Sequence, residues 1–183
     1  MACSAAVDTQ CFWQLIDEAR GLVGDPFDAD AVARQAEILF AVLPPDEIVA
    51  AEQVFWDLMS DAYRNPLWAA AYIINGGCSD DGFDYFRGWL ILQGRAAFER
   101  AVEDPDALAN LPAVRRAAHE EADLEGESAL GMASHAYTRA TGQPIPHTYT
   151  ITCRDLDPAW NFEFDDRAEM NRRLPLLARL YEF

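Results

Sequence analysis

The residues between Asp80 and Arg87 combine three carboxylates with a guanidinium, the side chains in this sequence whose spacing is most suggestive of chemistry. A carboxylate whose pKa is raised in a buried pocket can serve as a general acid or base, and Asp80, Asp81 and Asp84 are the candidates. Asp80 and Asp84 are four residues apart, so a helix would place them on one face. The spacing therefore indicates a ligand site between Asp80, Asp84 and Arg87.

The same residues also have a structural interpretation. Ser79 can cap a helix that begins at Asp80, and the helix dipole stabilises acids in a first turn. Arg87 follows Asp84 by three residues and can pair with it. The sequence leaves both interpretations open. If Asp84 binds a ligand, replacing it with alanine should abolish binding and leave the melting temperature nearly unchanged.

Aromatic residues accompany acids in two separate blocks, Cys78–Trp89 and Trp160–Asp166. Because the blocks share this composition, we expect them to meet and line one cleft with a carboxylate face and aromatic walls. Besides the three aspartates, the expected members of the cleft are Trp68, Tyr72, Arg87 and Arg95. Such a cleft suits a cationic or zwitterionic small molecule, or a basic peptide from a partner protein.

Metal ligation, nucleophilic catalysis and phosphate binding lack their usual spacings. The histidines, His119, His135 and His147, form neither an HExxH nor a paired ExxH motif, so we expect no metal site. Cys78 precedes a helix start, but the acids that follow it disfavour a thiolate. The NGG run at Asn75 lacks the strand and the lysine of a phosphate loop, and we expect no cofactor.

The composition argues against several classes of function. The 183 residues include 31 acidic and 14 basic ones, and the net charge of −17 disfavours binding to nucleic acids or anionic lipid surfaces. No apolar run reaches the roughly 18 residues of a membrane span, and we see no signal peptide. The four cysteines form no CxxC pair, which argues against a zinc site and a disulfide framework. We therefore expect a cytoplasmic protein in a reducing compartment.

Two helices must position the charged stretch. The first ends at Gly76-Gly77, since glycine adopts the left-handed conformation without a Cβ clash. The second contains Gly82 and Gly88, although an internal glycine costs about 1 kcal/mol relative to alanine. We expect both glycines to admit the close approach of a neighbouring segment.

Amphipathic periodicity predicts helices over most of the remaining chain, at residues 9–23, 28–43, 45–64, 96–102, 112–140 and 166–181. Gly126 or Gly131 is expected to divide the long helix, and Pro175 is expected to kink the last one. The prediction is an all-α, single-domain bundle of seven to nine helices over residues 1–183.

Residues 143–164 differ from the rest of the chain. Pro144 and Pro146 favour extended backbone, and residues 148–153 alternate with the period of a strand. Because one strand cannot form a sheet, this segment is either paired with an unrecognised strand or laid across the bundle as an extended arm.

The run AAYIINGGCSDDGFDYFRGWLILQGR, residues 70–95, resembles the signature of a bacterial family of uncharacterised proteins, domain of unknown function 4240. FWQLIDEAR near the start, the LPPDEI turn and the closing DDRAEMNRRLPLLARLY resemble the same family. The resemblance implies a cytosolic domain that sometimes accompanies other modules. It implies no reaction and no catalytic residue.

Three functional hypotheses follow. The first is a binding or interaction module with an acidic-aromatic cleft around residues 78–95. The second is a small cytosolic enzyme that uses Asp80, Asp81 or Asp84 as acid–base groups. The third is an inhibitor or immunity-type protein that offers an acidic face to a basic partner, although the acids are spread along the chain.

Overall fold

Residues 7–183 are described by a computed structural model and form an all-α fold, as the sequence predicted. Within this part of the chain nine helices have seven or more residues, in agreement with the expected seven to nine. The α-helices are α1 (Thr9–Leu22), α2 (Ala29–Phe40), α3 (Pro45–Asp61), α4 (Asn65–Ile74), α5 (Asp80–Leu92), α6 (Arg95–Glu103), α7 (Pro112–Glu120), α8 (Met132–Thr141), α9 (Arg167–Arg173) and α10 (Pro175–Leu180). The 3-10 helices are η1 (Pro105–Asn110), η2 (Glu127–Gly131) and η3 (Pro158–Trp160).

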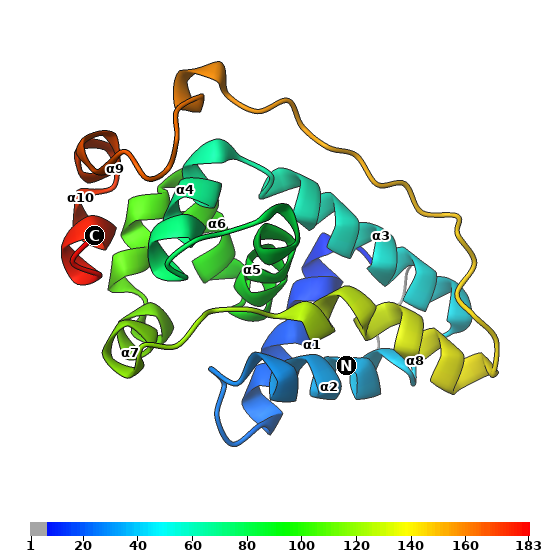
Figure 1. Cartoon of the computed structure of the whole chain (residues 1–183). Helices are drawn as coiled ribbons and strands as arrows, with labels where there is room; N and C mark the ends of the chain where they lie inside the picture. The colour runs from blue at the N-terminus through cyan, green and yellow to red at the C-terminus, as the bar shows by residue number, and fades with distance from the viewer. Residues whose placement is uncertain (1–6) are drawn as a thin grey trace.

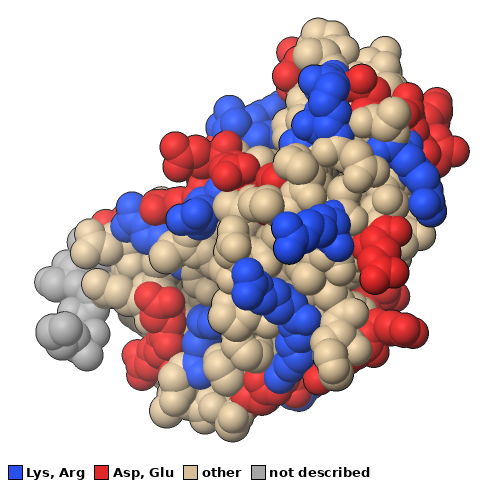
Figure 2. All heavy atoms as spheres, turned by 90° about the vertical axis from the view of Figure 1, so that its left-hand side faces the viewer, with Lys and Arg blue, Asp and Glu red and all other residues tan. Residues whose placement is uncertain are grey.

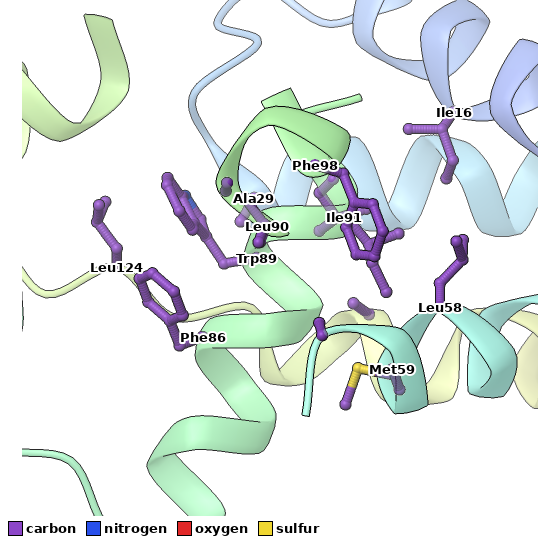
Figure 3. Close-up of a cluster of buried hydrophobic side chains, with 14 of the residues drawn as sticks. Ile16, Ala29, Leu58, Met59, Phe86, Trp89, Leu90, Ile91, Phe98 and Leu124 are labelled. Atoms are coloured by element: carbon purple, nitrogen blue, oxygen red, sulfur yellow. The ribbon is translucent and has the colours of Figure 1, made fainter. Parts of the chain in front are cut away.

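Helix α5 lies in the middle of the bundle (Figure 1). Its C-terminal half is apolar on all sides, and Trp89, Leu90 and Ile91 are each at most 1% exposed. Figure 3 shows these side chains in one cluster with Ile16 of α1 and Leu58 of α3. A helix that is buried all round cannot carry unpaired charges along its length. The aspartates of α5 are therefore confined to its first half, where the helix reaches the surface.

The turn between α4 and α5 follows the predicted local signals. Gly76 and Gly77 have φ angles of +64° and +143°, and the Gly77 N–H donates a hydrogen bond to the Tyr72 carbonyl over 2.9 Å. Ser79 caps α5 by accepting a hydrogen bond from the Gly82 N–H over 3.1 Å. The predicted helix stop and helix start are both confirmed.

The close approach expected at the glycines of α5 occurs at Gly88. A Cβ atom there would lie 2.7 Å from the backbone oxygen of Gly126, whose N–H donates to the Tyr85 carbonyl. At Gly82 the nearest atoms belong to the cap residues Ser79 and Cys78. The expectation was therefore wrong at Gly82, where the glycine only accommodates its own cap.

The expected helix at residues 112–140 is two α-helices, α7 and α8, and the segment between them is longer than the single glycine break that was expected. Helix α7 ends at Glu120, and Glu121 adopts a left-handed conformation with φ of +53°. The segment that follows is held by the Asn75 side chain, which accepts from the Leu124 N–H over 2.9 Å. Helix α8 begins only after η2, which ends at Gly131.

An extended arm, residues 142–157, connects α8 to η3 and passes along α3 (Figure 1). No described residue of the chain is in a β-strand, so the strand alternative for residues 148–153 was wrong and the extended arm was correct. Beyond the arm, Pro175 separates α9 from α10, so the expected kink is a complete break. Helix α10 packs against η1, α4 and α9.

Candidate functional site

Arg87 is the most deeply buried charged group of α5. It is 6% exposed, forms an ion pair with Asp84 one turn earlier, and donates to the Met59 carbonyl of α3. The guanidinium also lies over the rings of Tyr63 and Phe83, 5.0 and 4.9 Å from their centroids. Each of these contacts compensates a positive charge withdrawn from water.

Burial lowers the pKa of Arg87, and the neighbouring Asp84 carboxylate opposes that change. The Asp84 side chain is 41% exposed, so water also solvates the negative partner. The pair predicted from the three-residue spacing is thus present. It makes Asp84 a structural partner of Arg87 whatever else binds nearby.

A cavity of about 240 Å³ lies beside this ion pair. Helix α3 contributes Trp56, Met59 and Ser60, and the connection from α3 to α4 contributes Tyr63. Helices α4 and α5 contribute Trp68, Asp80, Asp84 and Arg87, and residues 151–153 of the arm form the remaining wall. We call this space the α3–α5 cavity. It combines three aromatic side chains with two carboxylates and one guanidinium.

Asp80 lines the α3–α5 cavity and is exposed at the first position of α5. Among the described residues it forms no ion pair within 4.0 Å. Asp81 is the next residue in the same turn, but it does not line the cavity and acts electrostatically on Tyr85. The pKa of Tyr85 is raised, mainly by Glu127 and to a smaller extent by burial and by Asp81.

Trp68 separates the α3–α5 cavity from a second hollow. Its ring stacks on Phe83 with centroids 4.8 Å apart, and its Nε1–H donates to the Cys78 carbonyl over 3.0 Å. The second hollow has a volume of about 330 Å³, and its walls include Tyr72 and residues 160–165. The two acidic-aromatic blocks therefore do not line one cleft, because only Cys78 of the first block reaches the hollow beside the second.

Arg95 lies outside both spaces. It is exposed at the start of α6 and forms an ion pair with Glu99 over 2.7 Å, one turn further along. The structure thus brings Trp68, Asp80, Asp84 and Arg87 together, whereas Tyr72 lines the second hollow and Asp81 and Arg95 lie apart.

Sequence reasoning missed the contribution of α3. Trp56 and Ser60 are four residues apart and share one face of α3, and Tyr63 follows in the connection to α4. This face of α3 lies beside the apolar face, whose residues Phe55, Leu58 and Met59 are buried. The spacing was visible, but only the tertiary structure shows that α5 and the arm face it.

Glu52 is a buried acid that the sequence did not indicate, and it contacts the cavity residue Trp56. It is 3% exposed on α3, and the Trp56 Nε1–H donates to its carboxylate over 3.0 Å. Burial raises the pKa of Glu52, while this hydrogen bond and His147 lower it. The carboxylate does not line the α3–α5 cavity.

The free cysteines lie at the two spaces, since Cys153 lines the α3–α5 cavity and Cys78 lines the second hollow. Burial raises the pKa of Cys78 to about 12, which keeps it a thiol. Cys78 and Cys153 are free, whereas Cys11 is disulfide-bonded, so the argument against disulfides does not hold at Cys11; Cys3 lies outside the described residues. Within residues 7–183 no group of three or more His, Cys, Asp or Glu side chains could hold a metal ion.

The fold and site define an all-α protein with an acidic and aromatic cavity between helices and an extended arm. The chain belongs to the family described as protein of unknown function DUF4240, whose model matches residues 7–139. The match includes every helix that lines the α3–α5 cavity; the arm and residues 165–181 lie beyond it. No curated protein and no solved structure is significantly similar to the chain. None of the helices within residues 7–183 has the length and apolarity needed to cross a membrane.

Proposed function

We propose that the protein is a binding module and that the α3–α5 cavity takes a positively charged group. The observation that carries the proposal is the charge arrangement of the cavity. Its one guanidinium, Arg87, is already paired with Asp84, while Asp80 has no such partner among the described residues. A cation that enters would meet one uncompensated carboxylate.

The walls of the cavity favour the same ligand. Trp56, Tyr63 and Trp68 supply aromatic side chains, and the face of an aromatic ring attracts a cation by about 0.5–2 kcal/mol. The volume of about 240 Å³ is small for a drug-sized ligand. It fits a guanidinium or ammonium group, such as the end of an arginine or lysine side chain or a small zwitterion.

Asp80 and Asp81 offer a matched test of this proposal. Both are exposed acids in the first turn of α5, so the helix dipole acts on both, but only Asp80 lines the cavity. Titration with N-acetylarginine amide, followed by NMR, should show affinity reduced about fivefold by Asp80→Asn. Asp81→Asn should leave it unchanged. If the wild type and the Asp80→Asn variant bind N-acetylarginine amide with equal affinity, the proposal is wrong.

The other hypotheses gain less support. An enzyme that uses Asp80, Asp81 or Asp84 needs a buried carboxylate, but Asp80 and Asp81 are exposed and Asp84 is engaged with Arg87. An inhibitor with an acidic face needs acids gathered on one surface. The face in Figure 2, the left-hand side of Figure 1, is not such a surface, because acidic and basic side chains are interspersed on it.

A further inference from the structure

A side chain of α3 holds the arm by hydrogen bonds to the backbone of the arm. The Gln53 side chain donates from Nε2 to the Thr150 carbonyl over 3.0 Å and accepts from the Thr150 N–H over 2.7 Å. These are the two hydrogen bonds that a neighbouring β-strand would make. The second N–H of Gln53 donates to Asp57 over 2.9 Å, which orients the amide. This amide can hold any extended peptide, because it recognises backbone atoms.

Side chains on both sides of Thr150 complete the attachment. The Tyr149 ring stacks on Trp56 with an interplanar angle of 5° and a centroid distance of 6.4 Å. Further along, the Thr152 hydroxyl donates to Ser60 over 3.3 Å. Arg154 forms an ion pair with Asp61. The receiving residues all lie on α3, and we call this face the α3 groove.

Beyond the buried Ile145, the arm contributes little to the core. Every residue from 147 to 155 is exposed or half-buried, and Ile151 is 53% exposed. A segment held by a few surface contacts opens at a small fraction of the global unfolding free energy. The arm nevertheless covers the α3–α5 cavity, since residues 151–153 form one of its walls. Its release would leave the groove and the cavity continuous.

The family model matches the α3 groove but does not match the arm that covers it. Helices α3, α4 and α5 lie inside the matched region, residues 7–139, and the arm lies outside it. Charge complementarity indicates what else the groove could hold. Asp57 is exposed and Asp61 is half-buried along it, Asp80 is exposed at the adjoining cavity, and the arm presents Arg154 to Asp61.

We propose that the α3 groove is a peptide-binding site, in which the arm is an internal ligand that an extended basic segment of a partner protein replaces. The inference rests on the proposed function, because the cation that enters the α3–α5 cavity would belong to that segment. The partner segment carries an aromatic residue in the place of Tyr149 and a basic residue in the place of Arg154. Gln53 holds its backbone between them.

The test uses the full chain and a peptide with the sequence of the arm. The probe is residues 147–155 with serine in place of Cys153, and the protein is a Tyr149→Ala, Arg154→Ala variant in which the groove is intact. Weakening the internal competitor raises the apparent affinity, so this variant should bind the probe at least about tenfold more tightly than the wild type. Gln53→Leu in the same background should abolish binding, whereas Gln14→Leu, an exposed glutamine on α1, should not.

Three outcomes would overturn the inference: equal binding by the wild type and the Tyr149→Ala, Arg154→Ala variant, equal binding of a scrambled probe, or a variant that forms a dimer in place of a peptide complex.

The wild type provides a measurement without substitutions. Excess unlabelled probe should accelerate hydrogen exchange at the Thr150 N–H of the labelled protein, because the arm leaves Gln53. If N-acetylarginine amide binds through Asp80 and the probe does not bind, this inference alone fails. If the probe binds through Gln53 and the amide does not bind, the cation site fails.

Discussion

Asp84 and Arg87 of α5 form an ion pair in which the guanidinium is buried and the carboxylate is half-exposed. The two groups that the sequence placed around a ligand are therefore paired with each other. Because Asp84 is paired, the carboxylate available to an incoming cation is Asp80, one turn earlier.

The first prediction concerns the stability of this pair. Asp84→Ala leaves a buried guanidinium without its carboxylate, and we expect a loss of about 1.5–3 kcal/mol in the free energy of unfolding. The melting temperature should fall by about 2–4 °C for each kcal/mol. This replaces the expectation from sequence that the melting temperature would hardly change. Thermal unfolding of Asp84→Ala and of Asp81→Ala measures the difference, and equal melting temperatures would contradict it.

The second prediction concerns the close approach at Gly88. A Cβ atom there would lie 2.7 Å from a backbone oxygen, which cannot move as a flexible side chain would. We expect Gly88→Ala to destabilise the protein by about 1–3 kcal/mol. Gly21→Ala in α1 is the control, since no atom lies within 4 Å of the added Cβ and alanine favours helix. Chemical denaturation of both variants should give changes of opposite sign.

The third prediction concerns the pH dependence that Glu52 confers. Its pKa is raised in the folded protein, so the folded state binds more protons than the unfolded state between the unfolded and folded pKa values. Stability from this group is therefore lost as the pH rises through that interval. Glu52→Gln keeps an acceptor for Trp56 and should be more stable than the wild type at neutral pH.

Denaturation from about pH 4 upward checks this dependence, because the advantage of Glu52→Gln should grow as the pH rises through the interval between the unfolded and folded pKa values. Glu18→Gln, which replaces an exposed acid on α1, should show no such trend. An advantage that is constant or shrinks with rising pH would contradict the raised pKa as its cause.

The fourth prediction uses the absence of lysine from the chain. A carbodiimide joins an amine to a carboxylate in contact with it, so a lysine-bearing probe has few competing amines. With an N-acetylated, C-amidated arm peptide that carries lysine in the place of Arg154, we expect a cross-link to Asp61 in the Tyr149→Ala, Arg154→Ala variant. Mass spectrometry locates the link. Asp61→Asn should remove it, and a link found mainly on acids outside the α3 groove would contradict the binding register.

Most helices could be predicted from the sequence because their starts and stops are local. Ser79 caps α5 through a contact within a few residues, and the left-handed Gly76 follows the end of α4. Asp80, Asp84 and Arg87 could be grouped for the same reason, since one helix carries all three. The all-α class follows from these signals together with the amphipathic periodicity of the other segments.

The tertiary structure decided what faces these residues. Gln53 and Thr150 are 97 positions apart, and no local pattern links a glutamine on a helix to the backbone of a distant extended segment. Periodicity records which side of a helix is buried, but not which other element covers it. The division into the α3–α5 cavity and a second hollow, the burial of Glu52 and the path of the arm all depend on such long-range packing, and they became visible only in three dimensions.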